Sequence, residues 1–290
     1  MTRRLLPTDE EIPALVPGPG SVTWSRAADA RTLLAAGYAL VLQVAHPTVG
    51  AGVAEHSAYR EDPWGRLLRT LDFTTSVIYT DPVSAAAVAR GIRLRHRRIK
   101  GVRPDGRRYH ALDPDAYAWV WASLYAAIVD GHERFGSPLA GAERERMWAE
   151  WRRLGRLLGV REETLPAGLD AYEDYFEEIV QDVLEDNGSV RDVIASIGTP
   201  AGPPLPPYAR PAWKIARLPA ARTLRLATIG LLPALLRERL DLRLTLSEEL
   251  ELRALGAASR AATPLLPRQL RVYGPTYVRL RRGEAGSAAA

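Results

Sequence analysis

The sequence predicts an all-α protein with a single domain. Three aspartates, Asp62, Asp81 and Asp113, are each followed directly by proline. Aspartate at the N-cap and proline at the first helical position together mark the start of a helix. Signals for β-hairpins are nearly absent after Trp24. With 290 residues, of which 47% are hydrophobic, the chain is long enough to bury a substantial core and an internal cavity.

The segment from Leu33 to Ala45 predicts the central helix of this domain. It is apolar on every side, which is typical of a helix that is buried all round. Pro47 ends or kinks this helix, because proline lacks a backbone N–H donor. We expect about ten helices in all, with further ones near residues 140–159, 167–185, 189–197, 221–238 and 247–260.

The two ends of the chain are predicted to lie outside the helical domain. Residues 1–23 are rich in proline and glycine and predict an extended arm. Residues 24–282 carry the helical signals and form the domain. Residues 283–290 hold mostly small side chains and predict a disordered tail.

Composition and missing motifs exclude several classes of chemistry. The chain has no cysteine, which excludes disulfides, thiolate metal sites, iron–sulfur clusters and cysteine nucleophiles. It contains no GxSxG elbow, Walker loop or GxGxxG motif. The first residues lack the apolar core of a signal peptide, and the stretch from Leu33 to Ala45 is shorter than the roughly 20 residues that cross a bilayer. We therefore expect a soluble cytoplasmic protein.

The net positive charge of the chain does not by itself indicate a nucleic-acid partner. The formal charge is +5 and the pI about 9.6. Most arginines alternate with acids, as in the segment from Glu143 to Arg156, which is typical of a solvated, ion-paired helix. One denser basic patch runs from Arg90 to Arg108, but no nucleic-acid module is recognisable, so no such partner is expected. The stretch from Leu226 to Leu240 is amphipathic enough to touch a membrane surface, although its pattern favours an ordinary buried helix.

His96 lies on an apolar helical stripe, where a histidine is a candidate metal ligand. Val88, Ile92, His96 and Ile99 follow one another at spacings of four, four and three, which puts them on one face of a helix. The arginines of the segment occupy the other faces, so His96 is expected to point to the core. Lys100, one turn further on, can reach an anion beside whatever His96 holds. The alternative is a structural histidine satisfied by a carbonyl.

Arg66 and Thr70 lie one turn apart on the helix expected from Asp62 to Val77. A buried arginine needs an anion, and a threonine hydroxyl one turn away offers a hydrogen bond at the same surface. Arg69 and Asp72 are equally suited to an ordinary solvated face, so this pair alone does not decide between the two interpretations.

The remaining histidines allow a second kind of site. A metal site built from His46, His56 and His96 is an alternative, although the spacing of these residues matches no zinc signature such as HExxH. His110 falls in an expected loop and His132 near a helix end. Both are interpreted as structural.

Three segments of the chain carry a resemblance to a known family. They read QVAHPTVGAGVAEHSAYREDPWGRLLRTLDF from Gln43, RLRHRRIKGVRPDGRRYHALDPDAYAWVWASL from Arg93 and GHERFG from Gly131. Together they resemble the DUF2236 family, which includes the MpaB-type oxygenases and shares its catalytic domain with the latex-clearing rubber oxygenases. The resemblance covers roughly residues 20–280.

This resemblance implies a globin-like helical domain with haem b in a buried pocket. His96 matches the histidine that binds the haem iron in the rubber oxygenases, and Lys100 matches the basic residue four positions later. Arg66 and Thr70 match an Arg-x-x-x-Thr element beside the haem. Arg69 stands where those enzymes have a lysine that approaches the iron, and a guanidinium is a poor ligand because it stays protonated.

We expect a haem b-dependent oxygenase or related oxidoreductase that uses O2 or peroxide on an apolar small molecule. The alternatives are a haem-free structural or regulatory helical protein and a non-haem metal enzyme. Cleavage of an extracellular polymer is not expected, because no secretory signal is recognisable. The expected site residues form two sets: the catalytic set is Arg66, Thr70 and His56, and the cofactor-binding set is His96 (the iron ligand), Lys100, Arg66, Arg69 and His46.

Overall fold

The structure, a computed structural model, describes residues 6–57, 62–198 and 210–288. Within these residues the secondary structure is predominantly helical, and the strands form a single two-stranded sheet. The predicted all-α class is therefore confirmed. Residues 1–5 of the expected arm and 289–290 of the expected tail lie outside the described residues.

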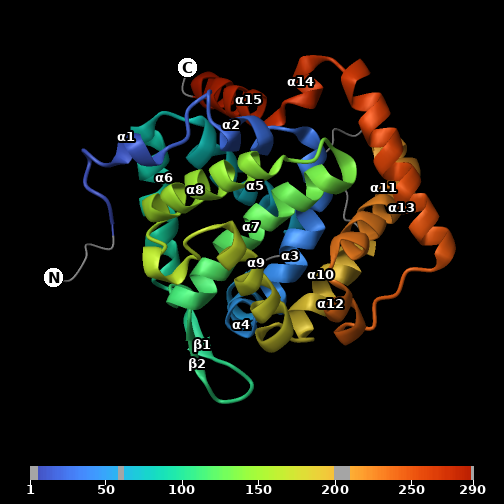
Figure 1. Ribbon diagram of the computed structural model, residues 1–290, viewed down its shortest axis with the longest axis horizontal. Helices are drawn as coiled ribbons and strands as arrows, with labels where there is room; N and C mark the ends of the chain where they lie inside the picture. Colours follow the sequence, from blue (N-terminus) through green and yellow to red (C-terminus); the bar gives the residue numbers. More distant parts are fainter. Residues whose placement is uncertain (1–5, 58–61, 199–209, 289–290) are drawn as a thin grey trace.

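The helices follow one another along the whole described chain (Figure 1). The first half contains α1 (Ile12–Leu15), α2 (Val22–Ala27), α3 (Ala36–Ala45), α4 (Pro47–His56), α5 (Pro63–Tyr79) and α6 (Pro82–His96). The second half contains α7 (Pro114–Phe135), α8 (Gly141–Leu158), α9 (Leu169–Glu178), α10 (Gly188–Gly198), α11 (Arg210–Leu231), α12 (Ala234–Arg239), α13 (Leu246–Ala262), α14 (Arg268–Arg271) and α15 (Tyr273–Ala288). Several are short, so they outnumber the ten that were expected.

Strands β1 (Lys100–Val102) and β2 (Arg108–His110) form an antiparallel hairpin between α6 and α7. Gly101 lies opposite Tyr109, and Gly106 in the connecting turn has φ +83°. Glycine tolerates this left-handed conformation because it has no Cβ. The hairpin projects from the lower end of the helical body (Figure 1).

The three Asp-Pro steps begin helices as the sequence predicts. The side chains of Asp62, Asp81 and Asp113 each accept a hydrogen bond from the backbone N–H three residues on, at 2.8, 2.9 and 3.1 Å. These bonds satisfy donors that have no partner within a first helical turn, which is why such sequences start helices.

Helix α7 lies in the middle of the helical body (Figure 1). Its Trp119 is fully buried, and the indole N–H donates to Leu42 O at 2.8 Å in α3. Trp121 stacks on Trp151 of α8 with centroids 4.4 Å apart, and each indole donates to the other residue's carbonyl at 2.8 and 2.9 Å. Buried polar tips are thus satisfied, and α7 is held to its neighbours on both sides.

The predicted central helix is only partly one α-helix. A 3-10 helix covers Ala30–Ala35 and leaves Leu33 exposed, and the buried part is α3. Pro47 ends it, and α4 leaves at an angle of 101°. Among the described helices none alone is long and apolar enough to cross a membrane, and the bent pair Ala30–Ala45 with Pro47–His56 passes that test only when taken together.

At both ends of the chain the structure differs from the prediction. Helix α1 interrupts the arm and buries Ile12 and Leu15 in the core, because these two apolar side chains find a partner surface on α6 and α8. Helix α15 continues through Ala288, past the start of the expected tail. Leu226 and Ile229 of α11 are buried, as expected for an ordinary core helix.

Candidate cofactor site

Helices α5 and α6 form a hairpin that brings the start of α5 beside the end of α6. Helix α5 ends at Tyr79, α6 begins at Pro82, and the two helices pack against each other. Arg66 and Thr70 lie near the start of α5, and His96 is the last residue of α6. The residues expected to form one site therefore lie toward the same end of this helical hairpin.

His96 is a half-buried, neutral imidazole. Burial lowers its pKa to about 4, and the positive charges of Arg95 and Arg93 act in the same direction. Its Nδ1 atom is buried and has no hydrogen-bond partner in the part of the chain that the structure describes. Histidine binds a metal through the lone pair of an unprotonated nitrogen of its neutral ring.

The ring of His96 rests against Tyr117 of α7. The two rings are edge to face, with centroids 5.7 Å apart and an interplanar angle of 90°. The Tyr117 hydroxyl donates to Leu158 O at 3.2 Å, at the end of α8, and burial raises its pKa to about 12. The hydroxyl bond and the backbone of α7 hold the tyrosine ring in place, and the ring in turn restricts the orientation of the histidine ring.

The buried stripe of α6 differs from the predicted one. Ala85, Ala86, Ala89 and Arg93 are buried, whereas His96 and the rest of its stripe are only half-buried. The expectation that the arginines take solvated faces is thus wrong for Arg93. Its Nη1 lies 3.4 Å from Gly159 O at the C-terminal cap of α8, where the helix dipole favours a cation.

Helix α5 leaves its apolar side chains partly uncovered near the site. Trp64, Leu67, Leu68 and Leu71 are all half-buried, and the first fully buried side chain on α5 is Thr75. Leucines on the inner face of a packed helix are normally buried. The first turns of α5 therefore present apolar side chains that the rest of the protein covers only in part.

Arg66, Thr70 and Arg69 have different surroundings on α5. Arg66 is half-buried and donates to the Ser57 hydroxyl just after α4. Thr70 is exposed and donates to Arg66 O at 3.0 Å. Arg69 is exposed and pairs with Asp62 at 3.2 Å. Of the three, Arg66 combines partial burial with a position beside the other candidate residues.

Lys100 does not continue the helix of His96. The α-helix ends at His96, and Lys100 is an exposed residue of strand β1. The expectation that it follows His96 by one helical turn is therefore wrong. Its carbonyl O lies 3.3 Å from His56 Nε2, which joins the end of α4 to the hairpin. His56 is exposed, and Glu55 Oε1 is 3.8 Å from the same ring nitrogen.

His46 and His110 both use Nδ1 to accept a backbone hydrogen bond. His46 is buried, caps the start of α4 through Thr48 N at 3.2 Å, and has its pKa lowered to about 4 by burial. His110 accepts from Leu112 N at 2.9 Å. These hydrogen bonds indicate a structural role for both rings.

The histidines do not assemble into a site for a bare metal ion. Among the described residues, no group of three or more histidine, cysteine, aspartate or glutamate side chains is arranged to hold a metal. The alternative site of His46, His56 and His96 is therefore not formed there. A haem group differs, because its macrocycle supplies four nitrogen ligands and the protein needs to supply one.

The comparison with known families agrees with this arrangement. Residues 24–261 match the family described as ER-bound oxygenase mpaB/B'/rubber oxygenase, catalytic domain. The chain belongs to this family. Its sequence also matches uncharacterized proteins of Mycobacterium bovis and Mycobacterium tuberculosis, each 30% identical over 173 residues, which is 58% of this chain and 67% of the relative. No solved structure matches the chain significantly.

The residues of this MpaB/rubber oxygenase family member fit a haem group. Haem needs one neutral imidazole, an apolar space and a cation for its propionates. His96 supplies the first through Nδ1, which has no partner among the described residues, and the half-buried side chains at the start of α5 offer apolar contacts for the second. Arg66 supplies the third from within the same segment.

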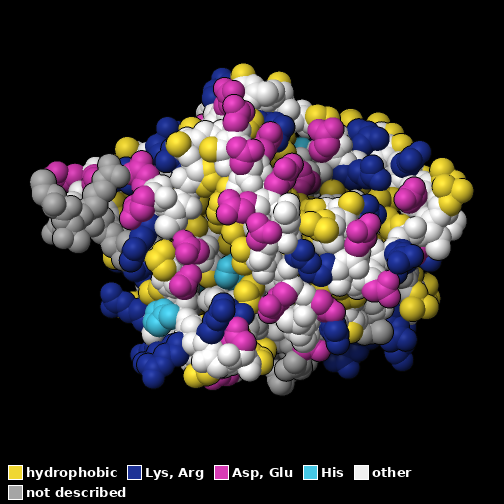
Figure 2. All heavy atoms as spheres, turned by 60° about the horizontal axis from the view of Figure 1, so that its bottom comes forward, with side chains coloured by type: hydrophobic (Ala, Val, Ile, Leu, Met, Phe, Trp, Pro, Cys, Tyr) yellow, Lys and Arg dark blue, Asp and Glu magenta, His cyan; other side chains and the backbone are white. Residues whose placement is uncertain are grey.

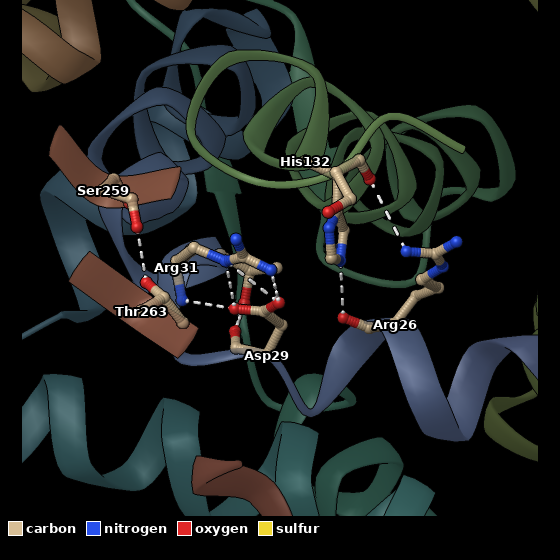
Figure 3. A network of polar contacts seen from close by, with 8 residues as sticks. Arg26, Asp29, Arg31, His132, Ser259 and Thr263 are labelled. Atoms are coloured by element: carbon tan, nitrogen blue, oxygen red, sulfur yellow. Dashed lines mark hydrogen bonds and ion pairs between the residues drawn. The ribbon is translucent and has the colours of Figure 1, made fainter. Parts of the chain in front are cut away.

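Sequence reasoning assigned His132 no role beyond structure, yet it is the most buried of the five histidines. Its side chain is 1% exposed, and Nε2–H donates to Arg26 O at 2.9 Å (Figure 3). Nδ1 is buried without a partner among the described residues, and burial lowers the pKa. Beside it, Asp29 binds Arg31 and Arg26 binds Glu143. This family member thus uses His132 to tie α7 to α2.

Asp130 was also missed. It accepts a hydrogen bond from the Tyr38 hydroxyl at 2.7 Å, and burial raises its pKa to about 6. The available signal was one acid directly after the apolar run from Tyr125 to Val129. A carboxyl group in such a run is either paired or protonated.

Proposed function

We propose that this protein is a haem b-dependent oxygenase that uses O2 or peroxide to oxidise an apolar small molecule, with His96 as the iron ligand. The observation that carries the proposal is the buried Nδ1 of His96, which is neutral and has no partner among the described residues. Membership of an oxygenase family supports the reaction type. When bound, haem supplies the iron centre at which the oxidant is activated.

The chain's own residues bind and orient in this proposal. His96 holds the iron through its neutral imidazole, and Tyr117 keeps the ring upright because its own hydroxyl is bonded to Leu158 O. The low pKa of His96 keeps the ring available as a ligand down to about pH 4. Burial and the cations Arg95 and Arg93 are the causes of this shift.

Arg66 is the better placed of the two cations proposed to neutralise the propionates. It is half-buried on α5, whereas Lys100 is exposed on β1. Arg69 is already paired with Asp62, and we assign it a secondary role in propionate binding, at the solvent-exposed edge of the haem pocket. Guanidinium groups bind carboxylates through two parallel hydrogen bonds, which suits a propionate.

Thr70 and His56 are the proposed polar contacts for oxidant and substrate. Among the described residues, the Thr70 hydroxyl bonds only Arg66 O of its own helix, so it can rotate toward a bound molecule. His56 is exposed beside Lys100 O, so a bound molecule can reach its ring. The buried ring of His46 lies at the N-terminal cap of α4, and we assign it a place in the lining of the haem pocket.

A haem-binding titration with matched histidine variants tests the proposal. The parent protein is reconstituted with haem and its Soret absorption recorded, together with His96→Gly and the control His110→Gly. We expect the Soret band of an imidazole complex in the parent and in His110→Gly, and its loss or displacement in His96→Gly. Added free imidazole should restore the parent spectrum in His96→Gly, because it refills the position left by the side chain.

Two results would overturn the proposal. The absence of any Soret band in the reconstituted parent would favour a haem-free helical protein. A parent-like spectrum in His96→Gly without imidazole would move the iron ligand to another residue. Circular dichroism of the three proteins separates loss of haem binding from loss of fold.

A further inference from the structure

The positive charge of this chain is concentrated in a short segment. From Arg93 to His110 it carries eight arginine and lysine residues and one aspartate, a formal +7 against +5 for the whole chain. The rest of the molecule is therefore net negative. A charge separated in this way directs one face of a protein toward an anionic partner.

Apart from the buried Arg93 and the half-buried Arg103, the cations of this segment are exposed. Asp105, the one acid, binds Arg103 at 2.8 Å. Among the described residues, no acidic side chain pairs with the following exposed cations: Arg95, Arg97, Arg98, Lys100 and Arg108. Figure 2 turns this end of the molecule forward and shows basic side chains gathered at its lower left.

Apolar side chains stand between these cations. Leu94 is 59% exposed on the last turn of α6, and Val102 is 61% exposed on β1. Exposed leucine and valine among arginines add nothing to the solubility of a surface. Between cations that attract anionic headgroups, such side chains can insert shallowly into the headgroup region of a bilayer.

The first turns of α11 repeat this combination. Ile215 and Leu218 are 80% and 67% exposed and lie one turn apart. Arg210, Lys214 and Arg217 follow the neighbouring stripe of the same helix, with no acid between Arg210 and Arg217. A basic stripe beside an exposed apolar stripe is the pattern of a helix that lies in a membrane interface, with its cations at the headgroups.

Side-chain contacts connect the two segments around the start of α5. Trp213 of α11 is edge to face with Trp64 of α5, with centroids 6.3 Å apart. Two residues further along α5, Arg66 donates to Ser57. The neighbouring His56 bonds Lys100 O in β1. Both cationic segments therefore flank the partly uncovered apolar side chains of α5.

We propose that the segment Arg93–Arg108 and the first turns of α11 together dock on an anionic lipid membrane. Nucleic acid explains the cations but leaves four exposed apolar side chains without a role. An anionic bilayer accounts for both, because its headgroups attract the cations and its acyl boundary takes the leucine, valine and isoleucine. This inference goes beyond the proposed function and does not depend on haem binding. It also provides a route by which a membrane-dissolved apolar molecule reaches α5.

Vesicle sedimentation tests the docking. The full-length protein is mixed with vesicles of phosphatidylcholine alone or of phosphatidylcholine with phosphatidylglycerol, at low and high salt. We expect binding to the anionic vesicles that weakens at high salt, because screening reduces the attraction of exposed charges. Reversing three charges, as Arg97→Glu, Arg98→Glu and Arg108→Glu, should weaken binding by at least about 100-fold, since each basic residue near an anionic surface contributes several-fold.

Matched variants separate this surface from general effects of charge and hydrophobicity. The charge control reverses three exposed arginines elsewhere, Arg146→Glu, Arg153→Glu and Arg253→Glu, and should bind far better than the first triple variant. The apolar pair Ile215→Ser with Leu218→Ser should lower binding. The control pair Leu265→Ser with Leu270→Ser, also exposed, should not. Thermal unfolding confirms that all variants are folded.

Three outcomes would overturn the proposal. The first is equal binding to neutral and anionic vesicles, and the second is equal loss in the patch and control triple variants. The third is no binding to either kind of vesicle. If duplex DNA is then bound in a manner that requires Arg97, Arg98 and Arg108, the surface recognises nucleic acid instead.

Discussion

The ring of His96 stands perpendicular to the ring of Tyr117, with 5.7 Å between the centroids. This relationship joins the candidate ligand on α6 to the central helix α7. Because the Tyr117 hydroxyl is bonded to Leu158 O, the contact also extends to the end of α8. A change at Tyr117 therefore tests how the orientation of His96 is maintained.

Two substitutions at Tyr117 should have separable effects. Tyr117→Phe keeps the ring and removes the bond to Leu158 O, at a cost of about 1 kcal/mol in unfolding free energy. Tyr117→Leu also removes the edge-to-face contact, at a further cost of about 1 kcal/mol. Urea unfolding measures both values. The ring-current shift of the His96 imidazole protons in NMR spectra should persist in Tyr117→Phe and disappear in Tyr117→Leu, and an unchanged shift in both would refute the contact.

The stability of the protein should fall in mild acid because of His46. Its pKa is about 4 in the folded state and near 6.5 when unfolded. Between these values the unfolded chain binds a proton that the folded chain does not, so the unfolding free energy decreases as the pH falls from 6.5 to 4. The contribution of His46 to this decrease is at most about 3 kcal/mol.

His46→Asn should flatten this dependence without removing the helix cap. Asparagine also accepts a hydrogen bond at an N-cap, as His46 does from Thr48 N. The measurement is the unfolding free energy in urea at several pH values between 4 and 7. A variant whose slope equals that of the parent would show that His46 is protonated in the folded state as readily as in the unfolded one.

Local signals in the sequence predicted the helix starts and the type of fold. Asp62, Asp81 and Asp113 cap helices because the bond joins residues three apart, so neighbouring sequence alone determines it. Pro47 ends α3 for an equally local reason. The match over residues 24–261 confirmed the family that the motifs indicated.

Contacts between distant residues were not predictable in the same way. The burial of Arg93 depends on Gly159 O, which lies 66 residues away in the chain. Lys100 was expected on the helix of His96, but the chain turns into β1, whose register depends on pairing with His110. In the candidate site, the family resemblance assigned Arg66 and His96 to one haem pocket, and their roles with haem stay predictions.

Replacing Asp130 should stabilise the protein at neutral pH. Its folded pKa is about 6 and its ordinary value is 3.8, so the folded chain binds a proton more readily than the unfolded one. The stability that this group contributes is thus complete below pH 3.8 and is lost as the pH rises through 6. Asp130→Asn removes the buried charge and retains an acceptor for the Tyr38 hydroxyl.

The expected gain for Asp130→Asn is about 1–2 kcal/mol at pH 7.5, and it should vanish toward pH 4. Its sign is opposite to the acid loss attributed to His46, so the two effects are distinguishable within one pH series. Asp115→Asn, an acid in the first turn of the same helix, serves as the control. A destabilised Asp130→Asn at pH 7.5 would mean that the charged carboxylate is needed by Tyr38 or its neighbours.

Two glycines of the chain adopt nearly the same positive φ. Gly159 has φ +80° and Gly106 has φ +83°. A Cβ at Gly106 would meet open space, whereas a Cβ at Gly159 would lie 2.7 Å from Arg93 Nη1. Alanine at either position costs about 1 kcal/mol through backbone strain alone. Gly159→Ala should cost more than Gly106→Ala, because it also displaces the buried guanidinium from the carbonyl that accepts its hydrogen bond.

The difference between the two variants therefore measures the contact of Arg93 with the end of α8. We expect Gly159→Ala to lower the unfolding free energy by about 1–3 kcal/mol more than Gly106→Ala. The excess should shrink in the background of Arg93→Met, where no guanidinium remains to be displaced. An excess that is unchanged by Arg93→Met would assign the cost to Leu6, the other side chain that the new Cβ would meet. The arginine would then be free of the α8 cap in solution.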